Sequence, residues 1–146
     1  MNNRQRKKWL KKHGLYINPK ECWNLDYTIA KFVLPRLKQF RKDNNGYPGT
    51  LSDEDEWNEI LDKMILAFEY IYDEDDWWIF NPKYDYTSGL KFEEVSRENG
   101  FTRTHIVKED WVDEIEQNYH IEAKHRNDVI EEGLELFAKY FRNLWW

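Results

Sequence analysis

The sequence predicts a mainly α-helical protein, a compact bundle of four to five helices with one long irregular segment around residues 77–106. Three observations support this fold class. Apolar residues recur at helical spacing in three stretches, turn-forming clusters separate these stretches, and strand-like alternation is weak. The weak alternation is compatible with a short β-hairpin inside the irregular segment. With 146 residues, 40% of them hydrophobic, the chain can form one hydrophobic core.

The first 20 residues form a basic arm that precedes a single helical domain at residues 21–146. The arm has seven basic residues and no acidic one, whereas the domain has 15 basic and 28 acidic residues, a net charge of −13. A short helix is expected from Asn2 to His13, ending at Gly14. Three interpretations stay open: a solvated tail, an arm that contacts phosphate or a partner, and a membrane-surface helix, which two apolar residues would anchor only weakly. The basic residues of this helix are Arg4, Arg6, Lys7, Lys8, Lys11 and Lys12.

The first helix of the domain is expected from about Asn24 to Arg41, because its apolar residues fall on one face at helical spacing. Asn24 is a suitable N-cap residue. Pro35 removes one backbone hydrogen bond, so it predicts a kink or a division into two helices. The apolar positions of this face are Leu25, Ile29, Phe32, Val33, Leu37 and Phe40.

A second helix follows the turn cluster at residues 43–50 and runs to about Tyr72. Ser52 is expected to cap it, with Asp55 as the third helical residue of a capping box. Its apolar stripe is the clearest in the chain and predicts a core helix. The members of this stripe are Trp57, Ile60, Leu61, Met64, Ile65, Phe68 and Tyr72.

The helical periodicity breaks between Asp73 and Val107. Residues 77–80 are too short a run for a helix of their own, whereas residues 92–98 are compatible with one or two helical turns. Residues 84–92 alternate loosely, as a short hairpin would. Long irregular segments in small domains commonly have a function or cover an edge of the core.

The C-terminal part is helical again, as one long helix or two between residues 108 and 144. Gly133 lies beside an apolar stripe and is expected at a close contact between helices. Trp145 and Trp146 end the chain and are expected to be docked on the domain.

Cysteine content and hydropathy predict a protein of the reducing cytoplasm. Cys22 is the only cysteine, which excludes an intrachain disulfide, and it is expected to be a small buried apolar residue. The basic N-terminus has no apolar segment after it, and no apolar run approaches the roughly 18 residues of a membrane span. A homodimer is compatible with this composition, but nothing in the sequence decides it.

Two neighbouring groups of residues are candidates for binding a partner. Carboxylates at both ends of the second helix form a solvated face, or a surface that mimics nucleic-acid phosphate in a basic groove of a partner. Calcium binding is a weaker alternative, because the spacing and glycine of an EF-hand are missing. The aromatic residues that follow cover the core or form a hot spot for a protein partner. The carboxylates are Asp53, Glu54, Glu56, Asp73, Glu74, Asp75 and Asp76, and the aromatic residues are Trp77, Trp78, Tyr84 and Tyr86.

Catalytic signatures are missing from the sequence, and no catalytic residue or cofactor is predicted. His120, Glu122 and His125 are weak candidates for a metal site, because they include a Glu-x-x-His step. Surface histidines beside glutamates are the simpler interpretation, since neither HExxH nor a second such step occurs. Nucleophile motifs of the GxSxG type and glycine-rich phosphate-binding loops are also missing.

Four stretches together resemble a family of small uncharacterised proteins of tailed bacteriophages and prophages. They cover about half of the chain, mainly its predicted helices, and no activity is known for the family, so the resemblance implies no site residue. The stretches are CWNLDYTIAKFVLPRLKQF (22–40), NGYP (45–48), EWNEILDKMILAFEY (56–70) and EEGLELFAKYFRNLWW (131–146).

This resemblance implies a phage-encoded, non-enzymatic protein that blocks or retargets a host or anti-phage-defence protein in the bacterial cytoplasm. The acidic helix ends, the aromatic residues and the missing catalytic motifs agree with that expectation. Two alternatives stay open. One is a metal-dependent enzyme that uses His120, Glu122 and His125, and the other is a structural or nucleic-acid-associated phage protein that acts through its basic arm.

Overall fold

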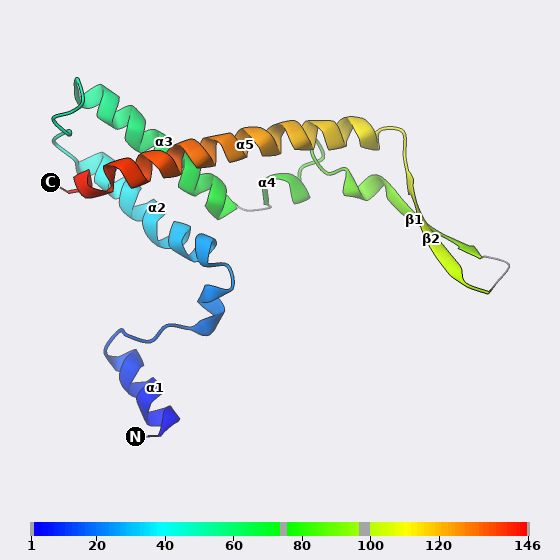
Figure 1. Ribbon diagram of the computed structural model, residues 1–146, viewed down its shortest axis with the longest axis horizontal. Coiled ribbons are helices and arrows are strands. Elements are labelled where there is room, and N and C mark those ends of the chain that lie inside the picture. The colour runs from blue at the N-terminus through cyan, green and yellow to red at the C-terminus, as the bar shows by residue number, and fades with distance from the viewer. Residues whose placement is uncertain (1, 74–75, 97–99, 146) are drawn as a thin grey trace.

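A computed structural model describes residues 2–73, 76–96 and 100–145 of the chain. Within these ranges the protein is mainly α-helical with one two-stranded antiparallel hairpin, which confirms the predicted fold class. The basic helix α1 and the hairpin project from the helical body in different directions (Figure 1). The elements are α1 (Asn3–Lys12), α2 (Leu25–Asp43), α3 (Glu54–Asp73), α4 (Asp76–Ile79), β1 (Leu90–Ser96), β2 (Thr102–Lys108) and α5 (Val112–Tyr140), with short 3₁₀ turns at Pro19–Cys22, Thr87–Gly89 and Phe141–Asn143.

The core lies where α3 packs against both α2 and α5. Trp57, Leu61 and Met64 of α3 are fully buried, as the apolar stripe predicted. Gly133 of α5 is buried against α3, where a Cβ atom would lie 2.3 Å from the Cβ atom of Ala67. The predicted close contact between helices at Gly133 is therefore confirmed.

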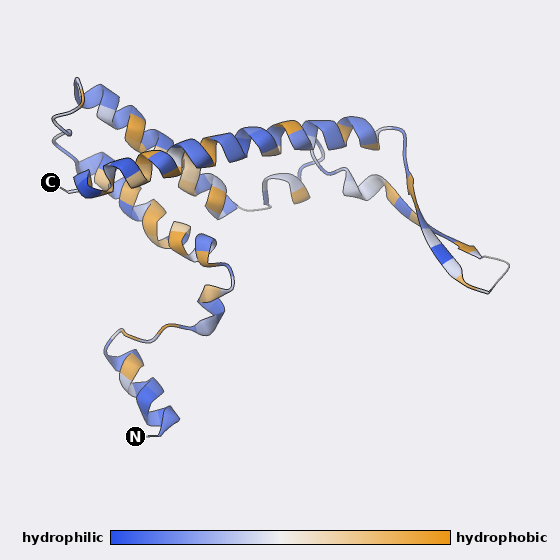
Figure 2. Ribbon diagram, viewed as in Figure 1, coloured by the Kyte–Doolittle hydropathy of each residue, from blue (hydrophilic) through white to orange (hydrophobic). Residues whose placement is uncertain are grey.

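Helix α2 continues through Pro35 as one helix, so a division there is excluded. Its C-terminal half packs in the core through Leu37 and Phe40. Its N-terminal half also contacts the body, since Ala30 is fully buried and the Tyr27 ring stacks on the Tyr72 ring of α3 at 5.0 Å between centroids. Its other side carries exposed hydrophobic residues, and Figure 2 shows this half of α2 as largely hydrophobic. The apolar face predicted for this helix is therefore only partly buried, and its first three positions lie outside the core. These positions are Leu25 at 53%, Ile29 at 46% and Phe32 at 59% exposure.

The predicted cap of α3 is displaced by one residue. The Asp53 carboxylate, rather than the Ser52 hydroxyl, accepts a hydrogen bond from the backbone N–H of Glu56 at 2.9 Å. The Glu56 carboxylate accepts one in return from the backbone N–H of Ser52 at 2.8 Å. The helix begins at Glu54, so the third helical residue is Glu56 and not Asp55.

The C-terminal region is one helix of 29 residues, α5, which decides between the one-helix and two-helix alternatives. The expected docking of the C-terminus is not found at Trp145. Leu144 packs against the core, but Trp145 is 73% exposed, and Trp146 lies outside the described residues. The expected burial of Cys22 is also wrong, because this residue lies in an exposed turn before α2.

The segment between α3 and α5 differs most from expectation. Residues 76–79 form a single helical turn, α4, where no helix was expected. The hairpin occurs at 90–108, so residues 92–96 are strand rather than helix, and residues 97 and 98 lie outside the described ranges. Phe92 is paired with Ile106 across the hairpin, and both side chains are exposed. A strand with one buried face shows alternating apolar and polar residues in its sequence. Neither face of this hairpin is buried, so that alternation is weak.

No helix in the described ranges is both long enough and apolar enough to cross a membrane.

A leucine at Gly133 is expected to destabilise the fold, because its side chain has no space between α5 and α3. We expect Gly133→Leu to lower the free energy of unfolding by about 2–3 kcal/mol, measured by urea denaturation. Gly46→Leu is the control, since a Cβ atom at Gly46 would meet nothing within 4 Å. Equal stability of the two variants would contradict the close contact.

Candidate functional site

The aromatic candidates gather around a residue that the sequence did not single out, Tyr119 of α5. The Trp77 ring stacks on the Tyr119 ring at 5.3 Å between centroids, and the Trp78 and Tyr86 rings meet its edge or face at 5.1 and 5.3 Å. Tyr84 joins the cluster through Trp77, also at 5.3 Å. All five side chains are half-buried, so the cluster attaches residues 77–86 to α5.

Arg126 of α5 connects this aromatic cluster to the end of α3. Its guanidinium carbon lies 3.9 Å from the centre of the Tyr70 ring and 5.0 Å from that of the Trp77 ring. Its Nη2 atom is 2.6 Å from Oδ2 of Asp73, and only 11% of its side chain is exposed. Cation–π contacts of a largely desolvated arginine are worth about 2 kcal/mol. Arg126 of α5 therefore contacts both α3 and α4 and holds the three helices together.

The acidic candidates do not form one surface. Asp53 and Glu56 cap the start of α3, and Asp73 pairs with Arg126 at its end, about 30 Å away for a 20-residue helix. Glu54 and Asp76 are exposed. Glu74 and Asp75 lie outside the described residues.

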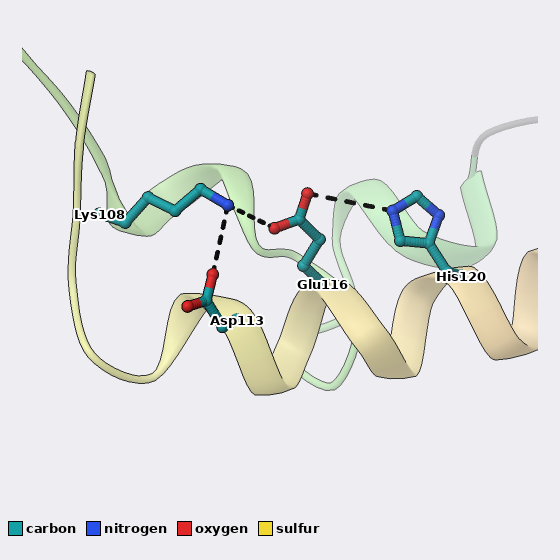
Figure 3. Close-up of polar contacts among 4 residues, drawn as sticks. All are labelled: Lys108, Asp113, Glu116 and His120. Carbon is teal, nitrogen blue, oxygen red and sulfur yellow. Dashed lines mark hydrogen bonds and ion pairs between the residues drawn. The ribbon is translucent and has the colours of Figure 1, made fainter. Parts of the chain in front are cut away.

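The three metal candidates all lie on α5 but are not brought together. His120 is directed to Glu116, with 3.9 Å between Nε2 and Oε1, and its side chain is 66% exposed (Figure 3). Neither Glu122 nor His125 joins it, and no group of three potential ligands suited to a metal ion occurs in the described part of the chain.

Lys108 attaches the end of the hairpin to α5 (Figure 3). Its Nζ atom lies 2.6 Å from Oε2 of Glu116 and 3.2 Å from Oδ1 of Asp113. Hydrogen bonds to Glu116 and then to Asp113 raise the pKa of Lys108 above its ordinary value of 10.5. A raised lysine pKa means that the contact stabilises the fold below the unfolded-state pKa and is lost as the pH rises through the folded-state pKa.

One surface that the sequence did not identify is apolar. Leu25, Ile29 and Phe32 lie at positions i, i+4 and i+7 of α2 and form an exposed row, the α2 stripe. At Phe32 the stripe continues into the α2–α5 groove, which has a volume of about 390 Å³. The helical spacing of these residues is visible in the sequence, but spacing alone does not show whether another helix covers them. The groove is lined by Phe32, Val33, Arg36, Leu37, Gln39, Phe40, Phe137 and Leu144.

The basic arm forms the predicted helix, α1, and all six of its basic side chains are exposed. Asn2 and Gln5 cap its start reciprocally, each side chain accepting a hydrogen bond from the other residue's backbone N–H. The chain turns at Gly14, whose φ of 68° is the left-handed conformation typical of a glycine after a helix.

Replacing Arg126 with methionine should loosen the aromatic cluster, because it removes the guanidinium group while keeping much of the apolar stem. We expect Arg126→Met to lower the free energy of unfolding by about 1–2 kcal/mol and to reduce the near-UV circular dichroism of the tryptophans. Lys124→Met is the matched control, an exposed site on the same helix with the same charge change. A structural role would be refuted if both variants behaved alike.

The pKa of Lys108 should fall toward its ordinary value in Glu116→Gln, because a neutral amide replaces the carboxylate that raises this pKa most. Heteronuclear NMR titration of the lysine side chains measures this change directly. Lys91 is the internal control, because its pKa is raised mainly by a hydrogen bond to Glu109, which the substitution leaves intact. An unchanged Lys108 pKa would show that the contact in Figure 3 is not formed in solution.

Comparisons with known proteins give no relative from which a function could be inferred. No family model, no curated protein and no solved structure matches the chain.

Proposed function

We propose that this chain is a phage-encoded binding protein that blocks or retargets a host or anti-phage-defence protein by direct contact through the α2 stripe and the α2–α5 groove. The observation behind this proposal is a row of three large apolar side chains that are each about half exposed. The row opens into an apolar groove beside α5. Exposed apolar patches of this kind are typical of surfaces that bind proteins.

The α2 stripe offers apolar area whose burial would favour binding. Complete burial of a leucine, isoleucine or phenylalanine side chain contributes about 1.5–3 kcal/mol. Since about half of each side chain of the α2 stripe is exposed, burial by a partner contributes roughly 1 kcal/mol for each. Together these contributions reach about 3 kcal/mol, and contacts in the α2–α5 groove would have to add the rest of the binding energy.

The surroundings of the stripe indicate the chemistry of the partner. The Arg36 guanidinium carbon lies 3.6 Å from the centre of the Phe32 ring, and an Nη1–H group donates to the Phe32 carbonyl oxygen at 2.7 Å. Lys31, next to Phe32 in the chain, is also exposed. An apolar row with basic neighbours favours an amphipathic helix with apolar anchors and acidic flanks as the bound segment.

Mimicry of nucleic acid has less support as the mechanism of binding. Asp53 and Glu56 serve as caps, and Asp73 is paired with Arg126, so three of the proposed mimetic carboxylates have roles inside the fold. The phage origin and the cytoplasm of the bacterial host as its location remain part of the proposal. They rely on the sequence resemblance described above.

The proposal is tested by capturing partners from a bacterial lysate with the wild-type protein and with an Ile29→Glu/Phe32→Glu variant. We expect the variant to lose the captured protein, because two charges then occupy the apolar row. Capture should persist at high salt, since burial of apolar surface is not screened by ions as mimicry would be. Thermal unfolding should show little loss of stability, because both sites are largely exposed.

Phe92→Glu is the matched control, since Phe92 is an exposed phenylalanine on the hairpin, at 69%. It should retain the captured protein. Loss of capture in Phe92→Glu but not in the α2 variant would place the interface on the hairpin and contradict the proposal. Capture that disappears at high salt would favour mimicry instead.

A further inference from the structure

The basic arm presents an unusually dense array of positive charge. Six basic side chains occur within the ten residues of α1, and all of them are exposed. None of them takes part in the ion pairs found among the described residues. The first 20 residues contain no carboxylate side chain that could neutralise them. This charge is therefore available to an external polyanion.

Local contacts give the arm a defined shape. The Trp9 ring stacks on the His13 ring with 4.2 Å between centroids. The Nζ atoms of Lys7 and Lys11 both lie 5.1 Å from the centre of the Tyr16 ring. These rings are engaged with side chains of the arm itself, so the arm offers cations for phosphate contacts rather than free aromatic faces for stacking on bases.

The spacing of the charges fits nucleic acid. A ten-residue helix is about 15 Å long, so α1 has roughly one positive charge per 2.5 Å of its axis. Duplex DNA has about one negative charge per 1.7 Å, and its major groove, about 12 Å wide, admits a helix. Arg4, Lys8 and Lys12 follow one another at i+4 intervals and so form one charged row along α1.

The acidic body of a second copy is a poorer match. Several of its carboxylates are already paired with bases of the same chain, among them Asp62 with Arg41, and Glu132 with Lys63. The net charge of −13 outside the arm also repels nucleic acid, so contact with a polyanion is confined to the arm.

We infer that α1, with the turn to residue 18, is a nucleic-acid-binding arm that contacts the phosphate backbone without reading its sequence. This activity is separate from the proposed binding of a host protein through α2, and either one can fail without the other.

Fluorescence anisotropy of a labelled DNA duplex of about 20 base pairs, titrated with the full chain, tests the inference. Affinity should fall about 100-fold between 50 and 200 mM salt if four phosphates are contacted. The variant Arg4→Gln/Lys8→Gln/Lys12→Gln should bind at least about tenfold more weakly at 50 mM salt. The slope of the logarithm of its binding constant against the logarithm of salt concentration should be smaller in magnitude by nearly 3, since about three phosphate contacts are lost.

The matched control is Lys31→Gln/Lys42→Gln/Lys124→Gln, in which three exposed lysines of the body are neutralised. Both triple variants change the net charge from −6 to −9, so they differ only in where the charge is lost. The control should bind DNA within about threefold of the wild-type affinity. An equal loss in both variants would show that only net charge matters and would overturn the inference.

Two further outcomes would also overturn it. Arm-dependent self-association at low salt without DNA binding, seen by light scattering, would identify a second copy as the partner. Arm-dependent binding to vesicles containing phosphatidylserine, without DNA binding, would identify a membrane surface. Loss of DNA binding in the Ile29→Glu/Phe32→Glu variant would contradict the separation of the two surfaces.

Discussion

Helix α5 is longer than the helix it packs against, and the middle of the fold follows from this mismatch. Its 29 residues span roughly 43 Å, whereas the 20 residues of α3 span about 30 Å. Beyond the end of α3, the first turns of α5 therefore need another cover. The aromatic cluster around Tyr119 provides it, and Arg126 lies at the junction, paired with Asp73 and in cation–π contact with Tyr70 and Trp77. The irregular segment thus covers the part of α5 that α3 is too short to reach.

Periodicity predicted those parts of the fold in which burial follows helical spacing. The α3 stripe and the contact at Gly133 are of this kind. The α2 stripe shows what periodicity leaves out, because an amphipathic pattern is the same whether or not a neighbouring helix reaches it. The hairpin was weakly signalled for the opposite reason, since strands exposed on both faces have no reason to alternate.

Among the candidate site residues, sequence reasoning identified residue types better than their partners. The aromatic residues do gather, but their centre, Tyr119, lies more than 30 residues from Tyr86 in the chain. Arg126 was not among the candidates, because its contacts with Tyr70 and Trp77 depend on tertiary structure. The cap of α3 was displaced because Ser52 and Asp53 are both good capping residues, and only the helix start decides between them.

The arm and the body have opposite charge, and the arm stands away from the body in Figure 1. Such a molecule has a large electric dipole moment. In the field of a polyanion it experiences a torque, so it turns arm-first before any contact forms, while the body is held outward. Association would then be fast and correctly oriented at low ionic strength, and it would lose this advantage once the Debye length, about 8 Å at physiological salt, screens the separated charges. The polarity of the chain is therefore a kinetic property as well as a structural one.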